Sequence, residues 1–518
     1  MTSEDSVSRR QPTSLEFSRL FRESLEVAGW RDAAAMIESH WDYFLPTEPE
    51  VLFNAIKALP GEALVETPSL LIGADYLQHV LSGADPRVFR RKASIGVDDR
   101  GGPDGLRERL IAFTGRIADH RSAGRIMAAV EEAQRARLML HRASSDDRAA
   151  IRAALPHLTV QWARSFDLAD NILALREYED TYDLALVNGQ PNTARRAAAS
   201  LAWMHADRGS TGSAELWLAR ARAAGEPQPR YDIPQYLAAA LLALHRLDLP
   251  TAEFELAAAL EVEPGEHWAA LLWLRALWAR LPLDAELLQQ ELDREVARHP
   301  PGLALQGANR RYLTSARWRL GLTLGTPIAA LRTDEFEDGT PGELSVESAY
   351  RRGDYAAALL SRAAQAGDVL PTRQHASALL ITAASRLRLG RESSAVEEFA
   401  KAFTIIEHER LLGMYALLRP EDLRELGEKS GCRVDDETLA RLGGWPGAAL
   451  PDIPKLTPRE VQVLQMLLST RSNAQIATDL FISPNTLKSL VRRLYKKLGV
   501  NTRQKAIDVA HSLGLDPS

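Results

Sequence analysis

The residues best suited to chemistry lie near the C-terminus, on a predicted helix that begins after Ser483-Pro484 and ends at Leu498. At about 100° per residue, its apolar face consists of Leu487, Val491, Leu494 and Leu498. The opposite face carries Asn485, Lys488, Ser489, Arg492, Arg493 and Lys496. Lys and Arg can donate to guanine O6 and N7 or to phosphate, and short side chains permit close approach. The pattern indicates a helix that could read a major groove, although a solvated charged face would look the same.

Three further helices are predicted around this one. The first begins at Thr457-Pro458, where Thr457 and Glu460 have the spacing of a capping box. The second runs over 473–480, with Ser472 or Asn473 as its cap and Phe481-Ile482 as the turn that follows. The fourth is capped by Thr502. Their predicted inward-facing residues are, in chain order, Val461, Leu464, Leu467, Leu468, Ile476, Ala477, Leu480, Ala506, Val509, Ala510 and Leu513.

The stretch 456–506 resembles the LuxR-type (GerE-type) helix-turn-helix, the output domain of many bacterial transcriptional regulators. The matching residues are LTPRE at 456–460, Asn473, Ile476-Ala477, Leu480, Ser483, Thr486, Lys488, Lys497-Leu498 and Arg503. The resemblance implies a domain over 456–518 that binds double-stranded DNA, with its fourth helix as the dimerisation helix of a homodimer. RNA polymerase is a further partner that it implies.

The resemblance also implies a role for individual residues. Lys488, Ser489 and Arg492 would face bases. The expected phosphate contacts are Ser483, Thr486, Arg493, Tyr495, Lys496 and Arg503, which would position the protein without specifying sequence. The expected helix-turn-helix core is Ile476, Ala477, Leu480, Leu487, Val491 and Leu494. Lys497, on the flank of the basic face, would pack its stem.

Three positions depart from the family pattern. Thr470 stands where the loop before the second helix usually has Gly, so that turn must be built differently. Leu487 replaces the usual Val within the core, which is a mild change. Leu490 replaces the most frequent His, which removes one polar contact near the DNA backbone.

The preceding chain reads as almost entirely helical, which predicts an all-α protein. Residues 1–14 are expected to be disordered, 15–442 to form a helical repeat region, and the Gly- and Pro-rich 443–455 to form a linker. The triplets Ala214–Leu218–Ala221, Ala252–Leu256–Ala259 and Ala395–Phe399–Ala402 have the small–large–small spacing of tetratricopeptide second helices, with Pro264 and Tyr236 at further matching positions. An irregular helical bundle is the alternative.

The order of features resembles the sensor regions of MalT-like regulators. The phrase LRLGRESSAVEEFAKAFTIIEHERLLGMYALLRPEDLREL at 387–426 is similar to the end of their repeat arrays, and IKALPGEALVETPSLLIGADYLQHVLSG at 56–83 to the beginning. The resemblance implies a region that senses a ligand or docks a protein. No GxxxxGK[ST] sequence occurs, so the nucleotide-binding module of large MalT-like regulators is missing.

Charge and composition support two distinct regions. The segment 455–518 contains ten Lys and Arg against four Asp and Glu, a net +6, whereas the rest of the chain carries a net −12. A basic end on an acidic body favours a polyanionic partner for the end alone. The sequence has no apolar run long enough for a membrane helix, no secretory leader and a single cysteine, Cys432, so we expect a cytoplasmic protein without membrane contact.

No catalytic or metal-ligating motif stands out: HExxH, paired CxxC and GxSxG are absent. We therefore expect no enzyme activity, metal or cofactor. Trp203, Trp217, Trp268 and Trp273 could line a ligand pocket, but their helical spacing favours core packing. The sequence predicts a sequence-specific DNA-binding regulator. The alternative is a protein-interaction adaptor whose C-terminal domain serves docking or dimerisation.

Overall fold

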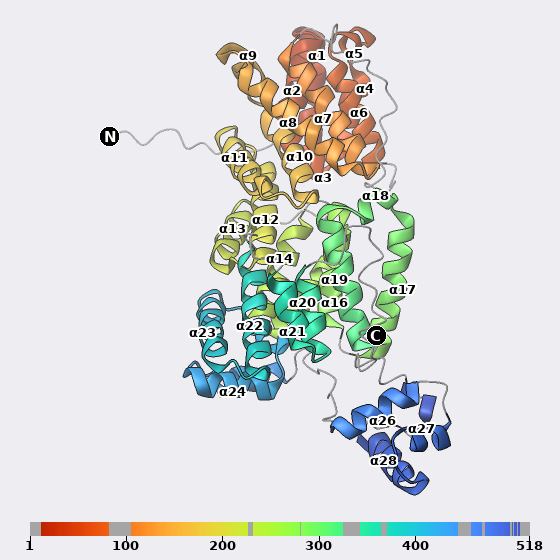
Figure 1. The fold of residues 1–518 in the computed structure, drawn as a ribbon. Coiled ribbons are helices and arrows are strands. Elements are labelled where there is room, and N and C mark those ends of the chain that lie inside the picture. Colours follow the sequence, from red (N-terminus) through yellow and green to blue (C-terminus); the bar gives the residue numbers. More distant parts are fainter. Residues whose placement is uncertain are drawn as a thin grey trace.

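The computed structural model describes residues 12–81, 105–225, 232–279, 281–324, 342–363, 370–443, 457–468, 472–497, 500, 502–504 and 506–507. Every regular element in these ranges is a helix, which confirms the predicted all-α class. Figure 1 shows a large helical body and a small separate group of helices from the C-terminal region. Most of the predicted disordered segment 1–14 and of the predicted linker 443–455 lies outside the described residues.

The first six helices form a compact group around an aromatic core. They are α1 (Ser14–Val27), α2 (Trp30–Ser39), α3 (Trp41–Thr47), α4 (Pro49–Ala58), α5 (Gly61–Glu66) and α6 (Pro68–Leu81). Thr13 and Glu16 form a capping box at the start of α1. Phe17 and Phe21 lie one turn apart on α1, and the Phe17 ring packs 5.0 Å from that of Phe44 on α3.

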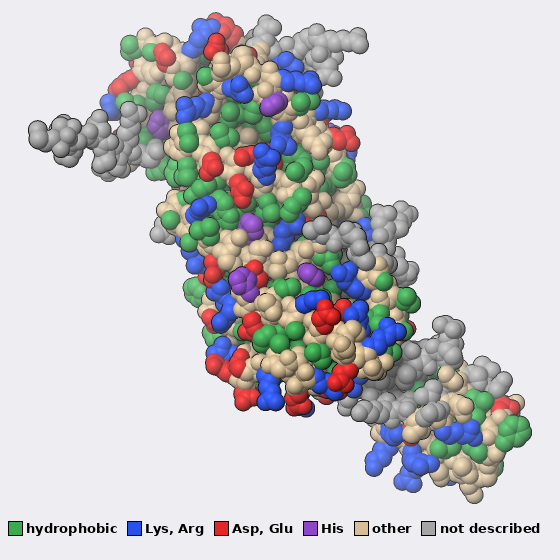
Figure 2. Space-filling view, turned by 60° about the vertical axis from the view of Figure 1, so that its left-hand side comes forward, with side chains coloured by type: hydrophobic (Ala, Val, Ile, Leu, Met, Phe, Trp, Pro, Cys, Tyr) green, Lys and Arg blue, Asp and Glu red, His purple; other side chains and the backbone are tan. Residues whose placement is uncertain are grey.

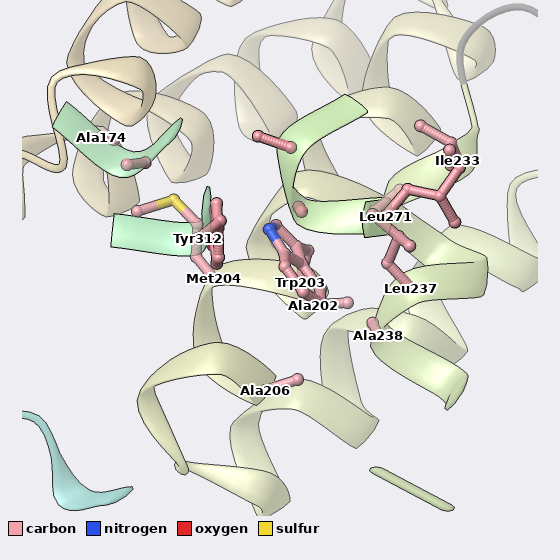
Figure 3. Packing of buried hydrophobic residues seen from close by; sticks show 14 of the residues in the cluster. Ala174, Ala202, Trp203, Met204, Ala206, Ile233, Leu237, Ala238, Leu271 and Tyr312 are labelled. Atoms are coloured by element: carbon pink, nitrogen blue, oxygen red, sulfur yellow. The ribbon is translucent and has the colours of Figure 1, made fainter. Parts of the chain in front are cut away.

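The middle of the body contains the largest core. Its helices are α7 (Leu106–Ser122), α8 (Ile126–Arg142), α9 (Ser145–Ile151), α10 (Leu155–Leu168), α11 (Leu173–Val187), α12 (Pro191–Arg208), α13 (Thr211–Ala223), α14 (Ile233–His245), α15 (Leu249–Leu260), η2 (Gly265–His267), α16 (Trp268–Trp278), α17 (Pro282–Arg298), α18 (Pro301–Ala304) and α19 (Gly307–Thr323). Figure 3 shows Trp203 near the centre of this core, between Tyr312 and the side chains of Leu237 and Leu271. Trp203, Trp217, Trp268 and Trp273 are all buried, so the core interpretation of the tryptophans is confirmed.

A third group of helices completes the body. It comprises α20 (Gly342–Arg351), α21 (Tyr355–Ala363), α22 (Thr372–Arg388), α23 (Glu392–Glu409), η4 (Leu412–Leu417), α24 (Pro420–Ser430) and α25 (Asp436–Leu442). Its core contains Phe399 of α23, and α23 packs against η4 and α24. Tyr350 of α20 donates a hydrogen bond of 2.6 Å to the buried Asp422 carboxylate of α24, which ties the first and the later helices of this group together.

The three predicted small–large–small triplets all lie on the second helix of a helix pair. Ala214–Leu218–Ala221 is on α13, Ala252–Leu256–Ala259 on α15 and Ala395–Phe399–Ala402 on α23, and every one of these residues is buried. Each helix packs on the one before it, α12, α14 or α22, across a short turn. Small residues let the paired helices approach closely, and the large residue fills the remaining space.

Polar side chains join parts of the body that are distant in sequence. The Asp42 carboxylate on α3 accepts hydrogen bonds from the backbone N–H groups of Asn192 and Thr193 at the start of α12, at 3.0 and 2.9 Å. Glu409, at the end of α23, accepts a 2.7 Å bond from the Thr211 N–H at the start of α13. Both carboxylates satisfy helix N-terminal donors that would otherwise lack partners.

Within the described ranges, no helix combines the length and the apolar character that crossing a bilayer requires.

Candidate nucleic-acid interface

Three helices, α26 (Pro458–Leu468), α27 (Asn473–Asp479) and α28 (Pro484–Lys497), form the C-terminal unit, which we call the head. Each begins at a side-chain cap. Thr457 and Glu460 form the predicted capping box. The Thr457 N–H donates to the Glu460 carboxylate at 2.7 Å, and the Glu460 N–H donates to the Thr457 hydroxyl at 3.3 Å. Ser472, rather than Asn473, caps α27 in a second box with Gln475. These caps fix where each helix starts.

Ser483 begins α28. Its hydroxyl accepts a 3.1 Å hydrogen bond from the Thr486 N–H and lies 2.8 Å from the Thr486 hydroxyl. The two residues predicted to contact phosphate at this end therefore form the helix cap. Both side chains are exposed, so they lie where an approaching phosphate could also meet the N-terminal N–H groups of α28.

The head has its own hydrophobic core. Its fully buried residues are Val463, Leu464, Leu467, Ile476, Ala477, Leu480, Leu487, Leu494 and Ala506, and Val491 packs against them half-buried. All six residues of the predicted helix-turn-helix core thus face the inside of the head. Ala506 contributes from the short described part of the fourth helix. The other predicted residues of that helix, Val509, Ala510 and Leu513, lie outside the described residues, as do Thr470, Leu498 and Gly499.

The buried stripe of α26 differs from the predicted one. Val463, which the sequence interpretation left out, is fully buried, and Glu460 is 5 % exposed, whereas Leu468 is only half-buried. The side chain of Val461 lies outside the described residues. The helix faces the core with positions 460, 463, 464 and 467, a regular helical stripe that includes a carboxylate.

A lysine from α28 accounts for the buried carboxylate. Lys497 Nζ lies 2.7 Å from Glu460 Oε2, the same oxygen that accepts from the Thr457 N–H. This hydrogen bond from Lys497 lowers the pKa of Glu460, and the Thr457 N–H acts in the same direction. The prediction that Lys497 only packs its stem was wrong, because its ammonium group joins the end of α28 to the start of α26.

The turn between α27 and α28 has an unusual backbone. Phe481 has a φ of 54°, in the left-handed region, and its side chain is 96 % exposed. The Ile482 N–H returns a 3.0 Å bond to the Ala477 carbonyl, and Arg459 Nη2 donates 2.8 Å to the Leu480 carbonyl. These bonds close the end of α27 and set the direction in which α28 leaves the turn.

The exposed face of α28 is cationic. Lys488, Ser489, Arg492, Arg493 and Lys496 are all exposed, opposite the buried Leu487 and Leu494. In Figure 2, Lys and Arg side chains gather on one side of the head, at the lower right of the view. Because the apolar face anchors the helix, the cationic face is held in a fixed orientation toward solvent. Such a face can donate hydrogen bonds to base edges and to phosphates.

Two further predicted phosphate contacts and one departure from the family pattern lie at the edge of this face. Tyr495 is half-buried against the core, and burial raises the pKa of its hydroxyl. Arg503 Nε donates a 3.0 Å hydrogen bond to the Leu467 carbonyl at the end of α26, so this guanidinium helps to hold the head together. Leu490 is half-buried and packs on the core, as a leucine at the edge of the apolar stripe should.

The described residues also bear on other kinds of site. No group of three or more His, Cys, Asp or Glu in the described ranges could hold a metal ion.

Arg121 and Arg164 on the body converge on Glu266, at 2.8 and 2.7 Å. Burial would raise the pKa of Glu266, but these two guanidinium groups lower it to about 2. This cluster gave no sequence signal, because both arginines lie more than a hundred residues before Glu266.

Comparison with known proteins identifies the head. The family described as "Bacterial regulatory proteins, luxR family" matches residues 454–510. The chain therefore carries a LuxR-family (GerE) helix-turn-helix domain at its C-terminal end, over the segment that contains α26, α27 and α28. No solved structure matches the chain.

Proposed function

Because residues 454–510 form a LuxR-family domain, we propose that this protein is a sequence-specific transcriptional regulator that binds DNA through α28. The observation that carries the proposal is the exposed face of that helix, which holds Lys488, Arg492, Arg493 and Lys496 opposite buried leucines. A helix anchored on one side and cationic on the other meets the requirements of a major-groove recognition helix.

The proposed contacts divide by position along α28. Lys488, Ser489 and Arg492 lie at the middle of the exposed face and would read base edges, Lys and Arg by donating to guanine O6 and N7. The proposed phosphate contacts are Ser483, Thr486, Arg493, Tyr495, Lys496 and Arg503. Ser483 and Thr486 support this role, since they stand exposed at the N-terminal end of the helix.

We propose that residues 15–442 form a tetratricopeptide-like array, similar to the sensor region of MalT-like regulators, that senses a ligand or docks a protein. The three buried triplets, each on the second helix of a pair, support the array. The same proposal assigns 1–14 to a disordered N-terminus, 443–455 to a linker and 456–518 to the DNA-binding domain. It also includes a homodimer on DNA, contact with RNA polymerase and a cytoplasmic location.

The test is binding of the full-length protein to genomic DNA fragments, followed by selection of the fragments that remain bound. We expect enrichment of one two-fold-related sequence and an affinity that falls steeply with salt, because phosphate contacts release counterions. The absence of salt-sensitive binding to any fragment would refute the proposal and favour the adaptor function. Binding that depends on salt but enriches no sequence would refute the base-reading role of Lys488 and Arg492.

A further inference from the structure

A cavity of about 300 Å³ lies in the body, between the first group of helices and α7 and α10. Its walls are mainly apolar and aromatic, and they include Ile37, Trp41, Ile56, Tyr76, Ile111 and Leu158. The helices that supply them lie side by side in Figure 1. A cavity of this size and lining is at the lower end of the range for small-molecule sites.

Five charged side chains that line the cavity, Glu38, Arg107, Arg121, Arg164 and Glu266, form ion pairs within the protein. Arg121, which is 4 % exposed, donates to Glu266 Oε1 at 2.8 Å and to the Gln161 side-chain oxygen at 2.6 Å. Arg164 lies 2.7 Å from the other oxygen of Glu266, and Arg107 pairs with Glu38. A charged ligand that displaced Arg121 from Glu266 would leave a deeply buried charge without its partner, which is costly. The cavity therefore favours a neutral ligand.

His157 offers the cavity a hydrogen-bond acceptor. Its Nδ1 lies 3.1 Å from the Thr193 hydroxyl oxygen, and that hydroxyl donates its single proton to Asp42 Oδ1 at 2.6 Å. The Thr193 oxygen can therefore only accept from His157, so the proton of the neutral ring is on Nδ1 and Nε2 carries a lone pair. Burial lowers the pKa of His157 to about 4, so the ring stays neutral at pH 7.

Among the described residues, this acceptor has no hydrogen-bond partner. His157 lines the cavity, and its Nε2 atom is buried without a hydrogen bond. A buried polar atom without a partner costs free energy, which a ligand donor would recover. A ligand O–H or N–H group that reached His157 Nε2 would supply this missing hydrogen bond.

We propose that this cavity binds a small, neutral, mostly apolar molecule that donates one hydrogen bond to His157 Nε2, such as a phenol-like or indole-like compound. The cavity would be the effector site of the regulator, and only that biological role rests on the proposed function. The Asp42–Thr193–His157 chain links the site to the start of α12 and so to the helix pairs of the body.

The test uses three probes with one ring system, measured by calorimetric titration of the full-length protein at pH 7. They are 2-naphthol, which is neutral and has a donor, naphthalene, which is neutral without one, and 2-naphthoate, which is charged. We expect 2-naphthol to bind about threefold to tenfold more tightly than naphthalene, the value of one ordinary hydrogen bond, and naphthoate to bind most weakly. Equal binding of all three, or no binding of 2-naphthol, would overturn the proposal.

Two substitutions of His157 separate its acceptor from its structural bond. His157→Asn keeps a group near the Nδ1 position that can donate to Thr193, but lacks the distal acceptor. His157→Gln places an amide oxygen near the Nε2 position. We expect Asn to abolish the preference for 2-naphthol over naphthalene and Gln to keep most of it. A preference that survives in His157→Asn would overturn the assigned contact.

A second pair of variants tests occupancy of the cavity itself. Ala118 on α7 lines the cavity, so Ala118→Phe should fill part of it and weaken 2-naphthol and naphthalene at least tenfold. Ala149 on α9 is exposed and does not line the cavity, so Ala149→Phe is the matched control and should bind as the parent does. Unchanged binding in Ala118→Phe, with a circular dichroism spectrum like that of the control, would overturn the location.

Binding of DNA is measured in parallel on the same protein. Salt-sensitive DNA binding without any 2-naphthol binding would overturn the cavity proposal and leave the regulator intact. Binding of 2-naphthol that responds to the His157 variants, in a protein that does not bind DNA, would support the cavity and refute the proposed function. The two failures are therefore distinguishable.

Discussion

Lys496 and Lys497 are neighbours in sequence, but their side chains lie in different surroundings and make different contacts. Lys496 is exposed on the cationic face of α28, where we propose that it meets phosphate. Lys497 Nζ lies 2.7 Å from Glu460 Oε2 and joins α28 to α26. We therefore predict that Lys496→Ala weakens DNA binding without destabilising the head. One lost phosphate contact flattens the slope of log affinity against log salt by about 0.9 per head, or about 1.8 in a dimer.

Lys497→Ala should do the reverse. The Glu460 side chain is 6 % exposed and would lose its charged partner, although the 2.7 Å bond from the Thr457 N–H would remain. Because Lys497 itself is 39 % exposed and its charge is partly screened, the expected cost is about 1 kcal/mol, a factor of about five in the folding equilibrium of the head. The salt slope of DNA binding should stay at the parent value.

The Glu460–Lys497 pair also sets the direction of a pH effect. Because the hydrogen bond from Lys497 lowers the folded-state pKa of Glu460, the stabilisation is present above the unfolded-state pKa and is lost as the pH falls through the folded value. The head of the parent should therefore lose stability in acid, below about pH 4.5. Lys497→Ala should reduce this acid sensitivity, since Glu460 then lacks the partner that favours its charged form.

The assays separate the two lysines. Fluorescence anisotropy with a selected DNA site, over a series of salt concentrations, gives the slope. Hydrogen exchange followed by mass spectrometry reports the stability of peptides from α26 and α28 within the full-length protein, and about 1 kcal/mol corresponds to about fivefold faster exchange. If Lys497→Ala flattened the slope as much as Lys496→Ala and left exchange unchanged, the assignment of the two faces of α28 would be wrong.

Other residues give sharper or simpler tests. Lys488→Ala and Arg492→Ala should each cost about 1–3 kcal/mol in binding to the selected site and relax base preference, as measured by repeating the selection with each variant. Leu494→Ala, which opens a cavity in the small head core, should cost about 2–5 kcal/mol and speed exchange throughout α26–α28. Gly307→Ala should lower the thermal midpoint of the body strongly, because a Cβ there would lie 1.9 Å from the Leu168 carbonyl oxygen and φ is +52°. Gly212→Ala should raise the midpoint slightly, because a Cβ there has no atom within 4 Å and Ala favours the helix more than Gly does. Phe481→Gly should slow exchange in the head slightly, since it relieves a left-handed backbone that costs about 1 kcal/mol, and unchanged or faster exchange would count against that strain.

The features that sequence alone predicted are those set by local rules. The Thr457–Glu460 cap and the Ser483 cap depend on residues three positions apart, and a helical wheel places Leu487 and Leu494 opposite Lys488 without any knowledge of the fold. The buried small–large–small triplets of α13, α15 and α23 follow from the same kind of spacing. The all-α fold class could be predicted from these local patterns alone.

The features that sequence missed depend on contacts between distant residues. The predicted stripe of α26 lacked Glu460 and Val463, which are both buried. Burial of the Glu460 carboxylate could not be expected from the helix alone, because its partner Lys497 lies 37 residues later. Arg503 was predicted to contact phosphate, and the sequence did not indicate that its Nε also donates to the Leu467 carbonyl, 36 residues earlier. Charge pattern alone could not distinguish an exposed cation from one that bonds to another part of the head.

The cavity is the clearest example of a feature that depends on residues distant in sequence. Nothing near His157 in the sequence indicates the proposed ligand site, because its proposed role depends on Thr193, 36 residues later, and on Asp42, which lies 151 residues before Thr193. Asp42 fixes the direction of the Thr193 hydroxyl, and the hydroxyl fixes the tautomer of His157. This tautomer leaves Nε2 as an acceptor on a residue that lines the apolar cavity. Replacing Asp42 by Asn would allow the hydroxyl to turn toward His157. The ring would then be free to carry its proton on Nε2, so the preference of the site should shift from ligands that donate a hydrogen bond to ligands that accept one.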